Sequence, residues 1–358
     1  MARVAFYAPM KSPGSQKPSG DREMARNLML ALAAQGNKVE LASDLRVYDK
    51  NGDRDLQRTL VRAAEIEAQR LSAELPFDTD LWVTYHNYYK APDLLGPKVC
   101  QARGIPYVQL ESTRASSRLN GPWADFAQAA HQACDAADII FYHTANDLIS
   151  LERDRLGKQA LVELPPFLPE TVLPVATTGD GPMLTVGMMR HGDKLASYRI
   201  LAEALSHLTC DWNLNIAGDG PARPDVEALM VPFGSRVHFL GQLDRATLQK
   251  IYQRASLLVW PGVNEAYGMV YLEAQATGLP VIAQDRPGVR DVLAPAVYPT
   301  VEAGARGLAD HMQNLLEDTA QRHALGANTR SYVARRHLMP QATERLWAHL
   351  RPLLKDVS

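Results

Sequence analysis

Short apolar runs that alternate with amphipathic helical segments are the feature that most restricts the fold of this chain of 358 residues. The runs are residues 3–8, 81–85, 105–110, 183–186 and 256–260. Such runs are typical of parallel strands that are buried on both faces. After the first run, Met24, Leu28 and Leu32 fall on one face of a helical segment. The alternation predicts an α/β architecture with parallel sheets.

The length and composition of the chain allow two such domains. With 358 residues and 46% hydrophobic content, the chain can bury two cores of ordinary size. Residues 164–169, continuing to Asp180 and Gly181, have the proline- and glycine-rich character of an interdomain linker. We therefore place a domain boundary near residue 175. A last helical segment is expected from Pro340 to Leu354.

Residues 260–274 give the strongest indication of function in the sequence. An apolar strand ends at Trp260, Pro261 and Gly262 break it, and a helix follows. Ligands bind at such strand ends in open α/β sheets. Gly268 lets a ligand approach the backbone, and the free N–H groups near Met269 and Val270 suit a phosphate.

Two glutamates lie in this segment, Glu265 in the loop and Glu273 in the helix. Glu265 can face a sugar hydroxyl, and Glu273 can reach a second polar group farther along. Exposed glutamates on surface helices are common, so an ordinary solvated helix is the competing interpretation.

Residues 182–293 resemble, in order and spacing, the C-terminal half of a known enzyme family. The segments that carry the resemblance are residues 183–190, 213–221, 236–241, 248–255 and 276–283, together with the two glutamates. The family is that of the retaining nucleotide-sugar glycosyltransferases of the GT-B fold, family four or glycosyltransferase group 1. It includes mannosyl-, glucosyl- and N-acetylglucosaminyltransferases.

The resemblance implies a GT-B fold, with two Rossmann-like domains whose parallel sheets face a central cleft. Residues 1–175 are then the acceptor-side domain, and residues 340–358 pack back on it as a helix. Residues 176–339 are the donor-binding domain. The implied reaction is retaining, metal-independent hexosyl transfer from a nucleotide-diphosphate sugar, with UDP the first choice of carrier and GDP the second. The acceptor is a lipid, a saccharide or another small molecule, and the donor is a substrate, so no cofactor is implied.

The resemblance also assigns residues. Arg190 and Lys194 match the family's phosphate-binding pair, Glu273 its ribose ligand and Glu265 the residue beside the donor sugar. Fixed cations suit this role because the leaving nucleotide diphosphate gains negative charge in the transition state. The other donor-binding residues that it implies are Gly20, Gly187, Gly218, Asp219, Leu240, Gly241, Tyr267, Gly268, Met269 and Val270.

The N-terminal half ends two of its expected strands in polar residues, at His86 and at Glu111. Relatives usually place a histidine near the second position, where this chain has Glu111 or Ser112 instead. Glu111 can accept a hydrogen bond from the acceptor hydroxyl or act as its base, and His86 competes for that role. Polar residues hydrogen-bonded to the backbone at strand ends are the structural alternative.

The acceptor itself is suggested by a few polar residues past these strands. Asn87, Arg114 and Arg118 are candidate acceptor ligands, with Lys11 and Lys90 on other loops. They favour an anionic acceptor, although a solvated basic surface gives the same pattern.

Several other classes of function are disfavoured. The two Asp-x-Asp triplets, at Asp53 and Asp78, lie in a polar turn and before a strand, so no metal site is expected. A net charge of −2 gives no reason to expect nucleic-acid binding. The isolated Cys100, Cys134 and Cys210 suggest neither a disulfide framework nor a metal cluster. No G-x-G-x-x-G follows the first strand, which disfavours a dinucleotide-dependent oxidoreductase.

We expect a cytoplasmic location, because no apolar run approaches membrane-spanning length and the N-terminus enters a strand without a signal peptide. Peripheral contact with the inner face of a membrane is a further expectation. The helix of residues 54–73 is one candidate for it, although an ordinary helix packed on the sheet is the preferred interpretation. Two alternatives to transfer stay open. One is a non-catalytic protein that binds nucleotide sugars, and the other is an epimerase or phosphorylase on the same fold.

Overall fold

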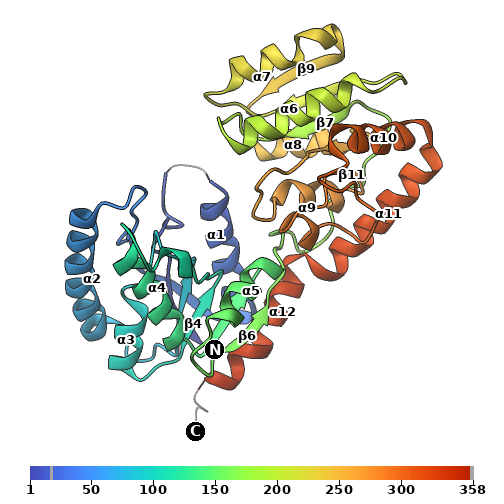
Figure 1. Cartoon of the computed structure of the whole chain (residues 1–358). Coiled ribbons are helices and arrows are strands. Elements are labelled where there is room, and N and C mark those ends of the chain that lie inside the picture. Colours follow the sequence, from blue (N-terminus) through green and yellow to red (C-terminus); the bar gives the residue numbers. More distant parts are fainter. Residues whose placement is uncertain (17–18, 355–358) are drawn as a thin grey trace. The chain divides into compact units, whose positions relative to one another are not determined.

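The computed structural model describes residues 1–16 and 19–354 and divides into two compact units. The first unit contains the chain up to Pro165 and the segment from Met339 onward, and the second runs from Pro166 to Leu338. Each unit has its own parallel sheet flanked by helices, as Figure 1 shows. The predicted α/β architecture is therefore confirmed.

The first unit is built on a six-stranded sheet in the order β2-β1-β3-β4-β5-β6. Its strands are β1 (Arg3–Tyr7), β2 (Lys38–Ser43), β3 (Leu81–Tyr85), β4 (Tyr107–Leu110), β5 (Ile139–Tyr142) and β6 (Ala160–Glu163). Its helices are α1 (Gly20–Ala33), α2 (Arg54–Glu74), α3 (Gly96–Arg103), α4 (Ala124–Ala136), α5 (Ala145–Arg153) and α12 (Met339–Leu350). All neighbouring strands are parallel, so helical crossovers carry the chain back between them.

The second unit is built on a five-stranded sheet in the order β11-β10-β7-β8-β9. Its strands are β7 (Met183–Val186), β8 (Leu214–Ala217), β9 (Val237–Gly241), β10 (Leu258–Val259) and β11 (Val281–Ile282). Its helices are α6 (Asp193–Ser206), α7 (Arg223–Met230), α8 (Arg245–Tyr252), α9 (Met269–Ala276), α10 (Gly304–Glu317) and α11 (Thr319–Arg336). The short central strand β10 pairs with β7 and β11, which places its end beside the end of β7.

The first segment of the first unit ends at Pro165, ten residues before the expected boundary near residue 175. The proline-rich residues 164–169 are hydrogen-bonded to the second unit. The Leu168 N–H donates to the carbonyl of His337 over 2.8 Å. The carbonyl of Pro166 accepts a hydrogen bond of 2.7 Å from Nδ1 of His337. These bonds attach the start of the expected linker to the second unit.

The final helix α12 packs on α1 within the first unit. Its Thr343 hydroxyl donates to the carbonyl of Ala31 over 3.4 Å, and Arg345 donates to the carbonyl of Glu163 over 3.2 Å. Leu346, Trp347 and Leu350, which share a helical face, are all buried. The packing therefore follows from one apolar face of the helix.

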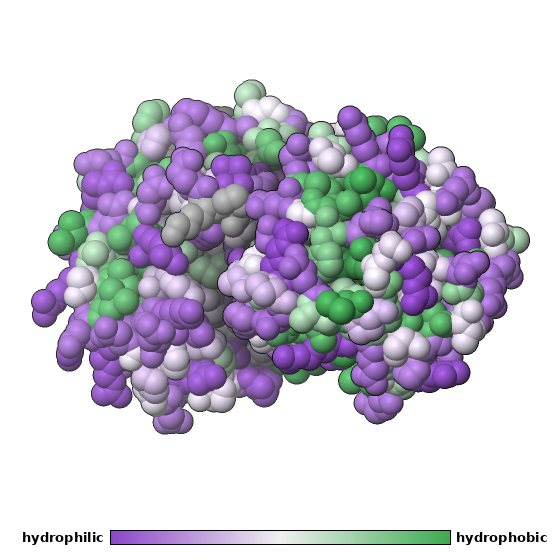
Figure 2. Space-filling view, turned by 90° about the horizontal axis from the view of Figure 1, so that it is seen from above, coloured by the Kyte–Doolittle hydropathy of each residue, from purple (hydrophilic) through white to green (hydrophobic). Residues whose placement is uncertain are grey.

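Among the described residues, no helix is both long and apolar enough to cross a membrane. The face of the molecule seen in Figure 2 is mostly hydrophilic, with hydrophobic residues in small groups. Large exposed apolar side chains such as Leu30, Ile66 and Phe77 are separate from one another in the sequence. Single exposed apolar side chains are normal on folded proteins.

Candidate functional site

The ends of β7 and β10 form the centre of the candidate site in the second unit. The buried ring of Trp260 follows β10 and stands edge-on to Tyr198, with ring centroids 5.1 Å apart. A Cβ at Gly187 would lie 3.1 Å from the Trp260 ring, and the Tyr198 hydroxyl donates to the Gly187 carbonyl over 2.9 Å. A side chain at Gly187 would therefore press on the indole ring, because the strand end and the ring lie in contact.

Lys194 and Glu265 are brought together on this indole ring. Lys194 Nζ pairs with Oε1 of Glu265, and Trp260 Nε1 donates to the same oxygen over 2.7 Å. The ammonium of Lys194 also lies 5.5 Å from the centre of the Trp260 ring. Both side chains are largely buried, with 25% of Lys194 and 14% of Glu265 exposed. A carboxylate with two donors on one oxygen is fixed in place, which suits a preorganised site.

Arg190 lies between β7 and α6 and differs from Lys194. It is exposed, and in the described part of the chain its guanidinium has no hydrogen bond or ion pair. The turn to α6 is completed by Gly192, whose φ is 82°. Of the two predicted phosphate ligands, Lys194 is therefore already neutralised by a carboxylate, whereas Arg190 is open to an anion.

The start of α9 provides backbone donors beside this cluster. Gly268 precedes the helix with a φ of 79°, and a Cβ there would lie 2.7 Å from the Tyr271 ring. The Tyr271 hydroxyl donates to the carbonyl of Trp260 over 3.1 Å, which ties the helix to the end of β10. Met269 and Val270 begin the first turn, where backbone N–H groups have no acceptor within the helix. This arrangement suits an anionic ligand.

Glu273 lies farther along α9 and is half-buried. Its Oε2 accepts a hydrogen bond of 2.9 Å from the hydroxyl of Tyr252. Burial raises the pKa of Glu273, and the bond from Tyr252 opposes this effect. A carboxyl group held by one oxygen can accept a ligand hydroxyl at the other. Tyr267, in the loop before α9, is also half-buried.

The glycine turn after β8 has a mainly steric role. Gly218 has a φ of 141°, and a Cβ there would lie 1.9 Å from the carbonyl oxygen of Gly187. Its N–H donates to the carbonyl of Gly241 over 2.8 Å, and Leu240 and Gly241 are half-buried. The Asp219 carboxylate accepts from the N–H of Gly220 over 2.7 Å and from Arg223 over 3.1 Å, so it orders the turn.

In the first unit, His86 and Glu111 end the neighbouring strands β3 and β4. The N–H of His86 donates to the carbonyl of Leu110 over 2.9 Å, which places the two strand ends side by side. Both residues have left-handed backbones, with φ of 70° at His86 and 55° at Glu111. Such conformations are uncommon outside glycine and cluster at functional sites.

Glu111 and His86 have further ionisable neighbours. Nδ1 of His86 lies 3.8 Å from a carboxylate oxygen of Asp21, at the start of α1. Oε2 of Glu111 lies 3.7 Å from Nε2 of the fully buried His143. Burial raises the pKa of Glu111 to about 7, although the nearby charge of His86 opposes the shift. Glu111 therefore has the pKa that a general base needs near neutral pH.

His143 was not predicted from the sequence. Its Nδ1 donates to the carbonyl of Leu164 over 2.6 Å, so Nε2 is the nitrogen that faces Glu111. Burial lowers the pKa of His143, which favours the neutral ring. Its position directly after β5 is the same signal that singled out His86 and Glu111.

Two of the predicted acceptor ligands have structural roles instead. The Asn87 side chain is fully buried, donates to the carbonyl of Ala130 over 3.0 Å and accepts from the N–H of Asp93 over 2.9 Å. The Arg114 side chain is also fully buried and pairs with Asp135 over 2.6 Å. Assigning these two residues to the acceptor was wrong, because their polar groups are engaged inside the first unit.

Arg118 and Gly20 are both exposed. Arg118 lies beside the rings of Tyr89 and Trp123. Gly20 is the first residue of α1, and a Cβ there would meet nothing within 4 Å. Its expected contact with the donor stays a prediction.

The Asp-x-Asp triplets hold structural positions. Asp53 caps α2 by accepting from the N–H groups of Asp55 and Leu56. Asp78 pairs with Arg3 over 3.0 Å, and Asp80 accepts the N–H of the same residue over 2.8 Å. Within residues 1–16 and 19–354, no cluster of three His, Cys, Asp or Glu side chains could hold a metal ion.

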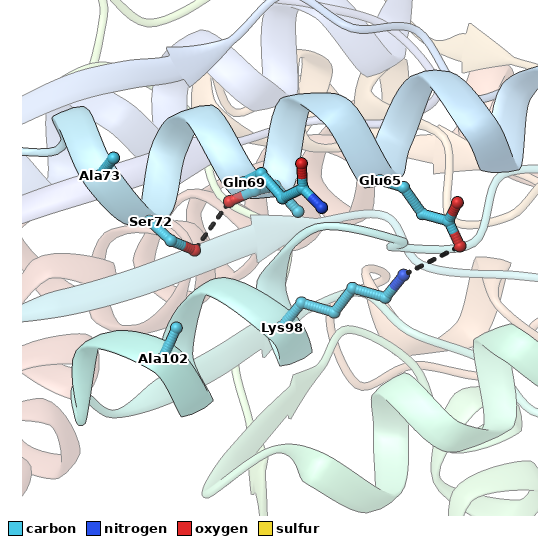
Figure 3. A pocket seen from close by; sticks show the side chains of 7 residues that line it. Glu65, Gln69, Ser72, Ala73, Lys98 and Ala102 are labelled. Carbon is cyan, nitrogen blue, oxygen red and sulfur yellow. Dashed lines mark hydrogen bonds and ion pairs between the residues drawn. The ribbon is translucent and has the colours of Figure 1, made fainter.

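A pocket of about 650 Å³ lies apart from the strand ends, between α2 and α3 (Figure 3). Small side chains such as Ala68 and Ala102 line it, and Lys98 pairs with Glu65 across it over 3.7 Å. The pocket is an open groove between two helices. It contains none of the predicted site residues.

Comparison with known proteins supports the sequence resemblance. Residues 182–318 match the family model of the glycosyl transferases group 1. An alpha-D-kanosaminyltransferase of Streptomyces kanamyceticus is 29% identical over 46% of this chain and 44% of its own length. A D-inositol 3-phosphate glycosyltransferase of Xylanimonas cellulosilytica is 34% identical over 37% of this chain and 34% of its own. The chain thus matches less than half the length of these relatives.

Two solved structures resemble the chain over nearly its whole length. A sucrose-phosphate synthase of Thermosynechococcus elongatus has a TM-score of 0.72 and 20% identity and covers 99% of both chains. Anabaena HepE in complex with UDP has a TM-score of 0.72 and 14% identity, and covers 98% of this chain and all of its own. The chain therefore has the GT-B fold, and its second unit carries the match to the group 1 glycosyltransferases.

Proposed function

We propose that this protein is a glycosyltransferase that moves a sugar from a nucleotide-diphosphate sugar to an acceptor hydroxyl. The observation that carries the proposal is the Lys194–Glu265–Trp260 cluster, which stands at the strand ends beside Arg190 and the start of α9. These groups lie within the part of the chain that matches the group 1 glycosyltransferases.

The second unit would bind the donor. Arg190 and the N–H groups of Met269 and Val270 would hold the diphosphate, because they are donors open to an anion. Lys194 would share its charge between Glu265 and the phosphate as the sugar–phosphate bond breaks. Negative charge on the leaving group is then met by fixed donors, which lowers the barrier. Glu273 would accept a hydrogen bond from a ribose hydroxyl.

Glu265 would act on the sugar. Both of its hydrogen-bonding contacts use Oε1, which leaves Oε2 for the donor sugar. The fixed carboxylate can stabilise positive charge that develops at the sugar ring. A retaining outcome follows from the resemblance to family four, and no step in this scheme requires a metal ion. The sugar is proposed to be a hexosyl group.

The first unit would bind the acceptor. Glu111 would accept the proton of the attacking hydroxyl, and His86 would position that hydroxyl. UDP is the proposed carrier because the similar HepE binds it. GDP is the second choice, since a relative in Corynebacterium glutamicum is named as GDP-mannose-dependent. The same relative acts on a phosphatidylinositol mannoside, so a lipid acceptor and peripheral contact with the cytoplasmic face of a membrane belong to the proposal.

A calorimetric titration with UDP-, GDP-, ADP- and TDP-sugars, without added metal, tests the donor site. One donor should bind the wild type, and Glu273→Ala should weaken its binding about tenfold or more, the effect of losing a hydrogen bond to a charged group. Glu203→Ala is the matched control, because this exposed glutamate lies on α6. Absence of binding to every donor, by a folded protein, would overturn the proposal.

A non-catalytic nucleotide-sugar-binding protein is the second candidate. The observation that favours it is that Glu111 or Ser112 stands where relatives usually have a histidine. Release of free nucleotide in the presence of a panel of acceptors separates the two candidates. Donor binding without nucleotide release from any acceptor would support the binding protein.

A further inference from the structure

A group of two aromatic and two cationic side chains lies on the first unit, outside the residues assigned above to catalysis. The group consists of Tyr89, Lys90, Arg118 and Trp123 and is called here the aromatic–cation cluster. The two rings meet edge to face, with centroids 5.7 Å apart. Lys90 Nζ lies 5.5 Å from the Tyr89 ring and 5.4 Å from the Trp123 ring. Arg118 Cζ lies 5.2 Å and 5.6 Å from the same two rings.

Neither cation forms an ion pair. Among residues 1–16 and 19–354, no carboxylate lies within ion-pairing distance of Lys90 or Arg118. Two cations against the same pair of rings repel each other, and the rings offset only part of that cost. A bound anion would relieve it.

A buried polar network holds the cluster in place. The Asp49 carbonyl accepts from Nε1 of Trp123 over 3.2 Å, and the Asp49 N–H donates to the carbonyl of Lys90 over 2.9 Å. Gln57 Nε2 donates to the Asp49 carboxylate over 2.7 Å and to the carbonyl of Pro122 over 2.9 Å. Asp49 is 1% exposed and Gln57 is 3% exposed. The backbone of Lys90 and the indole of Trp123 are thus fixed by one buried carboxyl-amide pair.

Aromatic rings connect this cluster to the end of β3. The His86 ring lies 4.8 Å from the Tyr88 ring, and Tyr88 lies 5.6 Å from Tyr89. With the contact between Tyr89 and Trp123, the rings run without a break from His86 to the two cations. Aromatic faces and edges are suited to the apolar faces of sugar rings, and guanidinium and ammonium groups are suited to phosphate.

We propose that the aromatic–cation cluster binds a phosphate monoester of the acceptor, whose sugar lies along the rings toward His86. The acceptor is therefore an anionic saccharide. This inference rests on the proposed function, because it assigns the acceptor to the first unit. The phosphate can belong to a soluble sugar phosphate or to a lipid head group, and the chemistry recognised is the same.

Calorimetric titration of the full chain with glucose 6-phosphate and with glucose, at constant ionic strength and without donor, tests the site. The phosphate ester should bind more tightly than glucose. The variant Lys90→Met/Arg118→Met should bind it about tenfold or more weakly, since charge-assisted contacts to both cations are lost. The control Arg62→Met/Lys158→Met removes the same charge from exposed positions and should bind like the wild type.

A second arm uses vesicles of phosphatidylcholine with phosphatidic acid, measured by co-sedimentation. Cluster-dependent binding to these vesicles, with no binding to the soluble ester, would assign the phosphate to a lipid and support the inference. The inference would be overturned if the control variant lost as much binding as the Lys90→Met/Arg118→Met variant, or if neither arm showed binding that depends on the cluster. UDP binding measured on the same samples separates the two proposals, because it depends on the second unit and would persist if only the acceptor inference failed.

Discussion

The strand ends of the two units differ in which residues adopt a left-handed backbone conformation. In the second unit, glycines occupy nearly all of the left-handed positions around the candidate donor site, among them Gly218, Gly241 and Gly268. In the first unit, the corresponding strand ends carry His86 and Glu111 with left-handed backbones. Glycine adopts this conformation at no steric cost, whereas other residues are strained by about 1–2 kcal/mol.

The difference indicates where side chains matter. Around the candidate donor site, Gly218 and Gly268 lie against neighbouring groups, and a side chain at either position would overlap with them. At the ends of β3 and β4 the side chains are retained despite the strain, which is expected where they perform chemistry. The charged groups of the two units also differ. Lys194 and Glu265 form an ion pair, whereas Glu111 lies near the neutral ring of His143.

The largest effect is expected from Gly218→Ala in the second unit. The new Cβ would lie 1.9 Å from the carbonyl oxygen of Gly187, so the two strand-end loops must separate. Steric overlap and the disfavoured φ together should lower the free energy of unfolding by about 4 kcal/mol. Urea denaturation measures this loss, with Gly104→Ala in the first unit as a control that has a positive φ but open space. Similar losses in both variants would show that the conformation matters and the close contact does not.

Arg190→Ala and Lys194→Ala should both lower turnover about 100-fold, or about 3 kcal/mol, if each contacts the developing charge. Their effects on folding should differ. Loss of Lys194 leaves the mostly buried Glu265 without its cation and should lower the free energy of unfolding by about 1 kcal/mol, whereas exposed Arg190 has no partner to lose.

Steady-state kinetics and urea denaturation of both variants, with the exposed Arg199→Ala on α6 as control, distinguish these effects. An equal loss of stability in the Arg190 and Lys194 variants would contradict the contrast between a paired and an open cation.

The two units also differ in how much the sequence reveals. A candidate donor site could be proposed from the sequence because the residues that the resemblance assigns to it lie in order within one stretch, and the strand, loop and helix around Trp260 and Gly268 have local signals. The pairing of Lys194 with Glu265 could not, because the two residues are far apart in the chain. The partners of Asn87 and Arg114 were missed for the same reason: a polar residue after a strand can face outward or inward, and only tertiary packing decides.

The pH dependence of stability should report the burial of the Glu111 carboxyl at the end of β4. Its pKa in the folded protein is about 7 and its ordinary value is 4.5, so between these values the folded state binds more protons than the unfolded state. The free energy of unfolding then falls as pH rises through this window, by about 3 kcal/mol in total, and the penalty is constant above it. Relative to the wild type, Glu111→Gln should gain this amount of stability between pH 4.5 and 7.

Denaturation series at several pH values measure the effect, and Glu203→Gln provides the control. Turnover should rise through pH 7 in the wild type and lose that dependence in Glu111→Gln, because a base acts only when it is deprotonated. Parallel stability curves for the wild type and Glu111→Gln would remove the case for a protonated buried carboxyl.

The smallest predicted effect tests whether a strained left-handed backbone is by itself enough to identify a functional site. Gln35 also has a left-handed backbone, with φ of 62°, but lies in an exposed turn after α1. Gln35→Gly should raise the free energy of unfolding by up to about 1 kcal/mol, since relief of strain outweighs the loss of an exposed hydrogen bond from Arg351.

His86→Gly relieves similar strain but loses the ring contacts with Tyr85 and Tyr88, each worth about 0.5–1.5 kcal/mol, so its stability should change little or fall. Urea denaturation compares the two variants, and turnover should fall only in His86→Gly. A His86→Gly variant that is stabilised and fully active would identify the end of β3 as an ordinary turn and leave Glu111 to act without it.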